Sequence, residues 1–493
     1  MSTQDTRSQP GTDAPAPPHW DHERVEIPNK TPSDVERAVK SEVDAQPAFG
    51  VPISAQPIVD ELDKDDLFPE GGRGWLVVLG CFMLSSMTLG FGLCWGVFQE
   101  YYRHHILVGT SDSVLGLLGS TQGAVGTLSS LFIGKLGDRY GYKRFTVMAL
   151  VCSVGQLLGA AFGSKLWHFF LAQGILQGLA TGLCFPFVLA YPSQWFKRRR
   201  GLATGIVAAG SSFGGGTATL ILRAMLSHIS FRNTLLIYAG IHFICLVKEG
   251  PAGAAARAAR GRAGWADKAM LKDPVFWSTA LSLGLCIFGF FNPYFYMPTF
   301  AVERIPTLSP QYAVLPSSIM NFSSALGRSL IGLIADSIGP ANAFISYELF
   351  VCAGPVSQGR LIADSIGPAN AFISAILVSA LSQLLIWNFA YNYVTIMVFS
   401  VTFGLTGGCF LSLMTPLAAQ LFGTRNLAGL TGTFNFFMTP GNLAAAPIAG
   451  LVLSAAGGNW HAPISCSGGI QLFAIGFMLY SRLKRQPALL AKF

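Results

Sequence analysis

Two short strings with the same spacing, GKLGDRYG at residues 134–141 and GLIADSIG at residues 332–339, fit the pattern G-x-x-x-D-x-x-G. Each follows an apolar run of about membrane length, which is about 20 residues. The glycines allow a tight turn and a close approach of helices, and the aspartate can meet a nearby base or helix amino terminus. We therefore predict a repeated helical unit whose turns are shaped by Gly134, Asp138, Arg139, Gly141, Gly332, Asp336 and Gly339.

Composition places these turns in a membrane protein. Of the 493 residues, 51% are hydrophobic and 12% are charged, and the mean hydropathy is +0.47. Such values are typical of integral membrane proteins and exclude an ordinary soluble enzyme. The apolar runs predict an all-α polytopic protein of about twelve transmembrane helices, near 75–98, 113–133, 145–163, 166–193, 202–222, 231–247, 275–301, 312–334, 368–391, 393–421, 428–454 and 464–481.

Charge divides the chain and predicts its orientation. Up to Glu70 there are fifteen acidic and six basic residues among many Pro and Ser, which predicts a disordered tail. The later bases gather after the second, fourth and sixth spans, so by the positive-inside rule both termini are cytoplasmic. The basic pI then reflects membrane loops and does not indicate a nucleic-acid partner. We expect a cytoplasmic tail, an N-terminal six-helix half, a linker, a C-terminal six-helix half and a second tail at residues 1–70, 71–247, 248–273, 274–485 and 486–493.

The eighth predicted span carries one charge, Arg328. Ser317, Asn321 and Ser324 precede it at helical spacing, so a polar stripe ending in a cation occupies one helix face. A charge in hydrocarbon is costly and normally faces a water-filled cavity or a partner. Two interpretations follow. Arg328 binds an anionic or carbonyl-bearing solute through its fork of donors, or it snorkels to the loop and pairs with Asp336.

Weaker polar stripes lie in the fourth, seventh and eleventh spans. Each serves equally well as interhelical hydrogen bonding, worth only about 1 kcal/mol. Pro293 and Pro298 interrupt the seventh span and suit a gate. The predicted solute contacts are Arg328, Ser324, Asn321, Asn292, Tyr296, Gln173, Gln177 and Asn435.

Titratable and catalytic groups are sparse within the spans. None of the ten acidic residues after Glu70 falls in the middle of a predicted span, which leaves His242 as the titratable candidate, with a structural role as its alternative. The nine cysteines sit singly in apolar runs and are interpreted as packing residues. Phosphate loops, Ser/His/Asp sets and metal-ligand clusters are missing from the sequence. We therefore predict no enzyme activity, cofactor or metal.

Several stretches resemble a known family. GKLGDRYGYKR at 134–144 resembles the signature loop of the major facilitator superfamily. PEGGRGW at 69–75 and WFKRRRGLATGIVAAG at 195–210 resemble the two signatures of its monocarboxylate-permease family, and DPVFW at 273–277 and NPYFYMP at 292–298 are similar to fungal members. Across residues 69–485 the resemblance implies the major facilitator fold in a fungal plasma membrane, with the vacuolar membrane as the alternative.

The same resemblance shows where the family mechanism does not transfer. Animal monocarboxylate carriers hold a lysine in the first span and an aspartate one turn before the arginine of the eighth. Here Leu93 and Ser324 stand at those two places, and Arg328 matches the arginine. We predict a secondary transporter that moves a small organic solute, a monocarboxylate-like anion or related metabolite, by alternating access. The bilayer is its environment, and protons are a further candidate partner. The alternatives are a facilitated exporter or uniporter of a vitamin or secondary metabolite, and a transport-inactive nutrient sensor.

One sequence feature interrupts this pattern. The string LIADSIGPANAFIS occurs at residues 333–346 and again at 361–374. Removing residues 347–374 joins the eighth and ninth spans without loss of either, and Arg360 stands in the second copy where Gly332 stands in the first. We expect residues 347–374 to be a retained intron or a duplicated gene segment. The alternative is an enlarged cytoplasmic loop.

Overall fold

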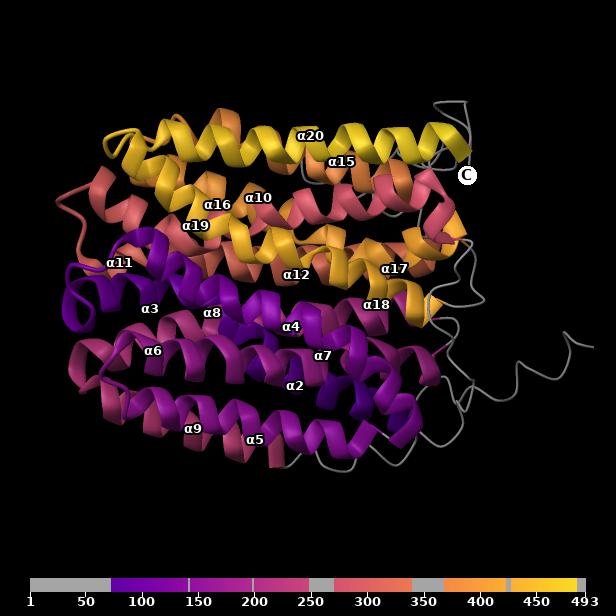
Figure 1. Cartoon of the computed structure of the whole chain (residues 1–493), viewed down its shortest axis with the longest axis horizontal. Coiled ribbons are helices and arrows are strands. Elements are labelled where there is room, and N and C mark those ends of the chain that lie inside the picture. Colours follow the sequence, from indigo (N-terminus) through magenta and orange to yellow (C-terminus); the bar gives the residue numbers. More distant parts are fainter. Residues whose placement is uncertain are drawn as a thin grey trace, which may run out of the picture. The chain divides into compact units, whose positions relative to one another are not determined.

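The computed structural model describes residues 72–140, 142–196, 199–247, 270–338, 368–422 and 427–485, all within one compact unit, Lys64–Phe493. All regular structure in these ranges is helical (Figure 1), which confirms the predicted fold class. The predicted tails at 1–70 and 486–493, and most of the predicted linker at 248–273, lie outside the described residues. So does most of the predicted insertion at 347–374.

Helices of the N-terminal half, residues 72–247, follow the predicted spans. They are α2 (Arg73–Leu93), α3 (Trp95–Tyr101), η2 (Tyr102–Ile106), α4 (Asp112–Tyr140), α5 (Tyr142–Ala161), α6 (Leu166–Phe169), η3 (Phe170–Leu176), α7 (Gln177–Trp195), α8 (Arg200–His228) and α9 (Phe231–Val247). The segments η2 and η3 are π-helical.

Helices of the C-terminal half, residues 270–485, do the same. They are η5 (Met270–Lys272), α10 (Pro274–Arg304), α11 (Pro310–Ala313), α12 (Leu315–Ile338), α15 (Pro368–Leu381), η6 (Ser382–Trp387), α16 (Tyr393–Gly407), α17 (Cys409–Phe422), α18 (Leu427–Phe437), α19 (Thr439–Ala455) and α20 (His461–Arg485). Each of the twelve predicted spans therefore coincides with a helical segment.

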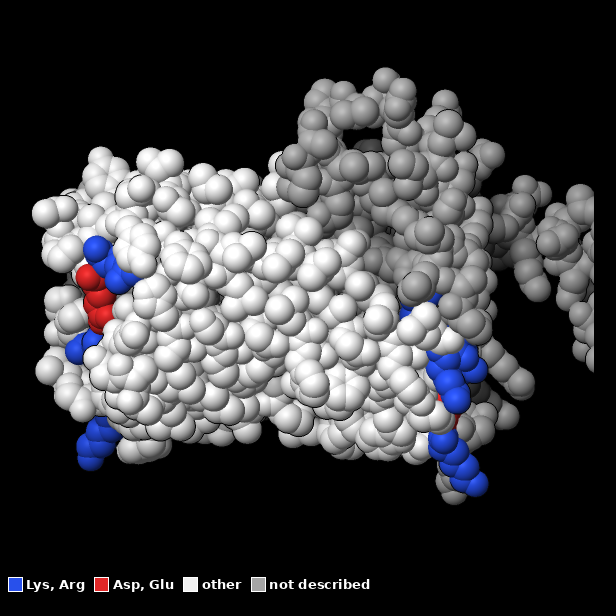
Figure 2. Space-filling view, turned by 90° about the horizontal axis from the view of Figure 1, so that it is seen from above, with Lys and Arg blue, Asp and Glu red and all other residues white. Residues whose placement is uncertain are grey.

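Eight helices in the described part of the chain are long and apolar enough to cross a membrane by length and composition. The predicted span at 368–391 contains a shorter apolar helix, Phe372–Trp387. Figure 2 shows charged side chains gathered toward the two ends of the helices, with an uncharged face between them. That distribution fits helices crossing a bilayer, because a charge in hydrocarbon is costly.

The two halves pack together along two pairs of helices. One pair is α8 with α12, and the other is α4 with α19; we call them the α8–α12 seam and the α4–α19 seam. Between the seams, α2 contacts α8 and α4, while α10 contacts α19 and α12. The helices of both halves thus form a ring, and Figure 1 shows α4, α8 and α12 near the middle of the bundle.

Glycines let α8 pack closely on α2. A Cβ at Gly214 would collide with the backbone of Ser86, and one at Gly90 would lie 2.7 Å from the carbonyl oxygen of Ser211. The backbones therefore approach closely, as small residues allow in membrane helices. Ser86 Oγ also donates a 2.8 Å hydrogen bond to the carbonyl of Gly210.

Gly214→Ala is expected to lower the thermal unfolding temperature of the purified protein, because the added methyl has no space against a backbone that cannot move away. The matched control is Gly240→Ala in α9, where no atom lies within 4 Å of the added Cβ. The measurement is a thermal unfolding curve in detergent. Equal unfolding temperatures for the two variants would show that the α2–α8 contact is not tight.

Two prolines interrupt α10, and both freed carbonyls lie at packing contacts. Pro293 has no N–H to offer the carbonyl of Gly289, and that carbonyl instead accepts hydrogen bonds from Gln383 Nε2 at 3.4 Å and Ser467 Oγ at 3.3 Å. Pro298 likewise frees the carbonyl of Tyr294, which lies 2.8 Å from a Cβ built at Gly96 of α3. The predicted gate at these prolines stays a prediction.

The two repeated strings are largely helical. Helix α4 continues to Tyr140 and α12 continues to Ile338, so the strings form the last turns of these helices and not a loop between helices. Side chains at these turns are not described, and two of the predicted turn residues lie outside the described residues altogether. Those within the helices are Gly134, Asp138, Arg139, Gly332 and Asp336, and those outside are Gly141 and Gly339.

Deleting residues 347–374 is expected to leave folding and surface expression unchanged. Helix α12 ends at Ile338 in the first copy of the duplicated string, and α15 begins at Pro368 in the second. The deletion joins the first copy to Ala375, so the sequence Pro-Ala-Asn-Ala-Phe-Ile-Ser still opens α15. Surface expression and thermal unfolding of the shortened chain measure this. A shortened chain that is retained inside the cell would show that the segment is needed.

Candidate functional site

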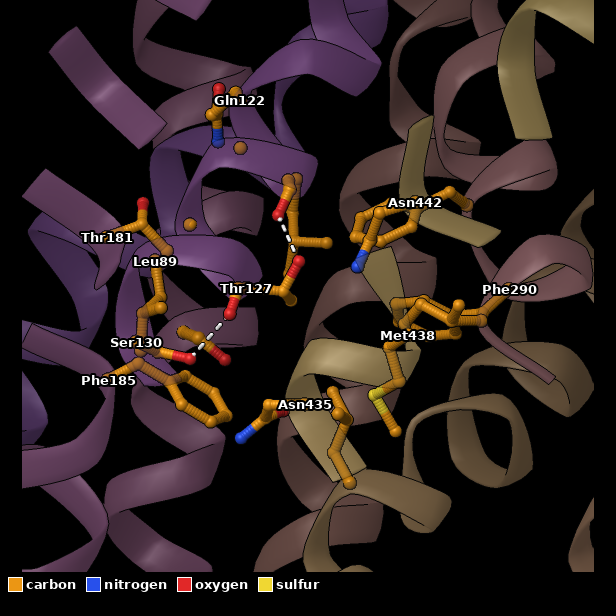
Figure 3. A pocket seen from close by; sticks show the side chains of 18 of the residues that line it. Leu89, Gln122, Thr127, Ser130, Thr181, Phe185, Phe290, Asn435, Met438 and Asn442 are labelled. Atoms are coloured by element: carbon orange, nitrogen blue, oxygen red, sulfur yellow. Dashed lines mark hydrogen bonds between the residues drawn. The ribbon is translucent and has the colours of Figure 1, made fainter. Parts of the chain in front are cut away.

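A cavity of about 140 Å³ lies between the two halves. Its lining comes from α2, α4, α7 and α8 on one side and from α10, α12, α17, α18 and α19 on the other. Large apolar side chains cover much of it, namely Leu89, Leu93, Phe185, Val188, Ile287, Phe290, Phe291, Phe295, Leu411 and Met438. Figure 3 shows Phe185 from the N-terminal half and Phe290 and Met438 from the C-terminal half at its walls.

Among the described residues that line the cavity, Arg328 is the charged one, and none of them is Asp or Glu. Its side chain is buried, and its Nη1 donates to Ser211 Oγ at 2.8 Å and to the Ala208 carbonyl at 3.2 Å. Its Nε and Nη2 have no hydrogen-bond partner among the described residues. Both nitrogens are buried against the protein, so this guanidinium has unpaired donors that a solute would reach only after a small movement of the side chain.

Room for the guanidinium comes from Gly408, between α16 and α17. A Cβ there would lie 2.7 Å from Nε and 2.8 Å from Nη2 of Arg328. The contact at Ala208 is eight residues into α8, about 12 Å along its axis at 1.5 Å per residue. This position does not fit an arginine that snorkels to the end of the bundle. The side chain of Asp336, the proposed partner in that interpretation, is not described.

The other members of the α12 stripe face α8 and do not line the cavity. Ser324 Oγ accepts a 3.1 Å hydrogen bond from Ser212 Oγ. Asn321 Nδ2 donates to the Ser317 carbonyl at 3.0 Å, and its Oδ1 lies 2.9 Å from a Cβ built at Gly215. The stripe thus lies in the α8–α12 seam, and only its cation reaches the cavity. Solute contact by Asn321 and Ser324 stays a prediction.

Of the remaining predicted solute contacts, some line a cavity and others hold helices together. Asn435 lines the cavity. Gln173 Oε1 accepts from Tyr102 OH at 2.7 Å, and Gln177 Nε2 donates to the Thr88 carbonyl at 2.8 Å, so both hold helices together. Asn292 and Tyr296 border a second, smaller cavity, where Tyr296 OH donates to the carbonyl of Ala446 at 2.7 Å.

The structure adds residues that the sequence prediction missed, above all a stripe on α4. Its cavity-lining members include Gly119, Gln122, Gly123, Gly126, Thr127 and Ser130, at helical spacings of three and four. Across the α4–α19 seam, Thr127 and Thr439 share a 3.0 Å hydrogen bond between hydroxyls. Asn442 of α19, a member of the weaker polar stripe predicted in the eleventh span, also lines the cavity, as does Ser211 of α8. The helical spacing of these α4 residues is a signal by which the sequence could have identified them.

His242 fits its structural alternative. Its Nδ1 lies 3.1 Å from Ser153 Oγ of α5, its ring lies against Phe91 and Tyr238, and it does not line the cavity. No group of three His, Cys, Asp or Glu side chains in the described ranges could hold a metal ion.

A cluster of charges joins the halves at one end of the bundle. Arg103 Nη1 lies 3.0 Å from Glu303 Oε1, and Arg103 Nε lies 3.6 Å from Asp112 Oδ1. Trp460 Nε1 donates to Glu303 Oε2 at 2.9 Å. We call these four residues the Arg103 latch. Arg103 and Asp112 belong to the N-terminal half, and Glu303 and Trp460 belong to the C-terminal half.

Asp112 of the Arg103 latch is expected to make the stability of the folded protein depend on pH. Burial raises the pKa of Asp112 above its ordinary value of 3.8, while Arg103 lowers it and Glu303 raises it further. The folded protein thus binds this proton more tightly than the unfolded chain, so stability from this group is lost as pH rises through the raised pKa. Asp112→Asn should reduce that dependence in unfolding curves between about pH 4 and pH 7. An unchanged pH profile would contradict the assignment.

Comparison with known proteins identifies the family. Residues 75–356 match the model of the Major Facilitator Superfamily. The chain is 30% identical over 419 residues to the MFS-type transporter pynF of Aspergillus niger, covering 84% of this chain and 89% of the relative. It is 29% identical to the agnestins efflux protein AgnL12 of Paecilomyces divaricatus, covering 85% and 90% of the two chains. It is 28% identical to the aspyridones efflux protein apdF of Emericella nidulans, covering 85% and 81%. The chain therefore belongs to the Major Facilitator Superfamily and is an integral membrane transporter.

Proposed function

We propose that this transporter exports a small organic solute that carries a carboxylate, an enolate or a cluster of carbonyl oxygens. The observation that carries the proposal is Arg328, a buried cation at the cavity; in the described part of the chain two of its nitrogens have no partner and no carboxylate lines the cavity. A buried charge without a counter-ion is costly, and an anionic solute supplies that counter-ion. The planar guanidinium binds two oxygens of such a group at once.

Size and polarity of the cavity support the same class of solute. A dry cavity of about 150 Å³ holds a molecule of the size of benzene, and the volume here is about 140 Å³. Phenylalanines line it, so an apolar ring or chain attached to the acidic group would be well packed. Two relatives are named as efflux proteins, for agnestins and for aspyridones. These names support export as the direction of transport.

The mechanism we infer is alternating access, in which the halves move against each other about the cavity. The Arg103 latch would close one end in one of the two states. We place this end outside the cell, in the plasma membrane, with both termini cytoplasmic, following the distribution of basic loops.

Proton symport of the monocarboxylate type has less support. The lining residues that the structure describes include no carboxylate, and Leu93 lines the cavity at the place that the resemblance gives to a lysine. We therefore propose a facilitated exporter that moves the solute down its own gradient. A pH gradient should then change efflux only as far as it changes the ionisation of the solute.

The test uses the full chain in proteoliposomes loaded with a panel of acids. The panel contains aromatic carboxylates, enolic 1,3-dicarbonyl compounds and an uncharged methyl ester for each acid. We expect efflux of at least one class of acids to exceed efflux from empty liposomes, with the esters no faster than the background. If no member of the panel moves faster with the protein than without it, the proposal fails.

A further inference from the structure

Three primary amides line the cavity together with Arg328 and come from other helices. They are Gln122 of α4, Asn435 of α18 and Asn442 of α19. All three side chains are buried within the bundle and open only to the cavity. Figure 3 shows Gln122 reaching the cavity from the N-terminal half and the two asparagines from the C-terminal half.

No described residue forms a hydrogen bond with any of these amide groups. Gln173, Gln177 and Gln383 each hydrogen-bond a neighbouring helix. Both amide atoms of Gln156 and Asn292 also lack a partner among the described residues, but these two residues do not line the cavity of about 140 Å³. An amide carries two donors and an acceptor with two lone pairs, and burying it without a partner is unfavourable. The three cavity amides are therefore free to bond a solute or the water that it displaces.

Glycines make room for these amides. Gly92 of α2 lies against Gln122 Nε2, and a Cβ at Gly123 would lie 3.0 Å from Asn442 Oδ1. Asn442 of the C-terminal half thus lies against Gly123, which follows Gln122 in the N-terminal half. The three amides line one cavity from both halves, so relative motion of the halves would change their spacing.

The position of these amides differs from that of the cation. Arg328 lies at the α8–α12 seam, where it bonds Ala208 and Ser211, whereas Asn442 lies against Gly123 at the α4–α19 seam and Gln122 lies against Gly92 of α2. Helices α2 and α10 separate the two seams, and their Leu89, Phe290 and Phe291 supply apolar walls. The cavity therefore offers one cation, apolar walls and, from other helices than the cation, three amides.

We propose that Gln122, Asn435 and Asn442 form a second polar subsite, which selects acids that carry a hydroxyl, amide or carbonyl group remote from the acidic group. A site built to hydrogen-bond a polar group rejects the analogue that lacks it, because its own polar atoms are then left unpaired. The inference rests on the proposed function for the acid contact at Arg328. The inference adds a second group of the solute, remote from the acidic group, that the transporter recognises.

The experiment compares two pairs of acids that differ only in the remote group: 4-hydroxybenzoate with benzoate, and 4-acetamidobenzoate with benzoate. Efflux from proteoliposomes and thermal stabilisation of the purified protein are both measured. For wild type we expect a preference of about tenfold or more for at least one substituted acid. Asn442→Leu and Gln122→Met, which keep side-chain size but lose the amide, should lower that preference, taken as the ratio of the two acids within each variant, to below about threefold.

The controls separate this inference from the proposed function. Asn233→Leu, on an exposed part of α9, should keep the wild-type preference. If wild type is stabilised by the substituted acid and does not move it, the proposed function fails, and the subsite is then judged by whether the amide variants lose the stabilisation. The subsite is overturned if the preference survives in both amide variants, or if neither acid stabilises or crosses with wild type.

Discussion

Replacing Arg328 by alanine is expected to reduce solute efflux by about 30-fold or more while the protein still reaches the membrane. Truncating one partner of a buried charge pair costs about 2–5 kcal/mol, and each 1.4 kcal/mol is about tenfold. Folding should be preserved because no described carboxylate pairs with this cation. Ser211, its hydroxyl partner, can bond water in the space left behind.

Two further variants separate the effect of the Arg328 charge on efflux from the effect of its geometry. Arg328→Lys keeps the charge but loses the planar fork of donors, so we expect efflux between those of wild type and Arg328→Ala. Gly408→Ala keeps the arginine but adds a methyl within 3 Å of its Nε and Nη2. The guanidinium must move, and efflux should fall although no charge is lost.

Matched controls exist for both changes. Ser318→Ala lies on the same helix at a buried position whose hydroxyl bonds the Val314 carbonyl, away from the cavity. Gly469→Ala adds a methyl with no atom within 4 Å. Efflux normalised to surface protein should be close to wild type for both. Wild-type efflux by Arg328→Ala at a normal surface level would exclude Arg328 as a solute contact.

Helix positions were predictable because a single constraint dominates them. Backbone groups in a bilayer must be hydrogen-bonded within the segment, so an apolar run of sufficient length becomes a helix. Even the sixth predicted span, 231–247, which is short for a full crossing, coincides with α9. The resemblance to the major facilitator signature added the superfamily, which the comparisons confirm. The narrower monocarboxylate-permease resemblance stays a prediction.

The role of a polar helix face was not predictable from that helix alone. Periodicity correctly placed Asn321, Ser324 and Arg328 on one face of α12, but the partner of that face is set elsewhere. Gly215 and Gly216 of α8 have no side chains, so α8 packs against Asn321 and Phe322 and fills the space that a cavity would need. Whether a polar stripe meets a solute or a helix thus depends on the surface opposite it.

The α4 stripe shows the opposite case. Gly119, Gln122, Gly126 and Ser130 recur at helical spacing and line the cavity, yet glycines in a membrane span are ordinarily explained by helix packing. Here they do both, because Gly119 and Gly126 pack closely on Trp95 and Thr181 and also line the cavity, where Gln122 is the large polar residue of the stripe. A lone amide among glycines at such spacing is therefore a signal for a solute site.

Reversing one charge of the Arg103 latch is expected to open that end of the transporter. The Arg103–Glu303 pair is partly exposed, and such pairs contribute little to overall stability, about 0–1 kcal/mol. It nevertheless joins the two halves, so even 1 kcal/mol shifts the balance between closed and open ends by about fivefold. Glu303→Arg replaces attraction by repulsion and also removes the acceptor of the Trp460 indole.

Labelling of Ser113→Cys by a membrane-impermeant maleimide measures this opening. Ser113 is half-buried, and its backbone nitrogen lies 2.9 Å from a Cβ built at Gly450 of the other half. Glu303→Arg should increase the labelling rate several-fold. Trp460→Phe, which removes only the indole hydrogen bond to Glu303, should increase it much less.

Restoring the pair with swapped charges provides the decisive control. Combining Arg103→Glu with Glu303→Arg renews the attraction between halves, but the new carboxylate at residue 103 then faces Asp112, which lies 3.6 Å from the arginine in the native protein. The swap alone should therefore restore slow labelling only in part, and adding Asp112→Asn should complete the restoration. If the triple variant labels as fast as Glu303→Arg, the latch does not hold the halves together, and closure at this end must come from the close packing of Gly96, Gly116 and Gly450 against the opposite half.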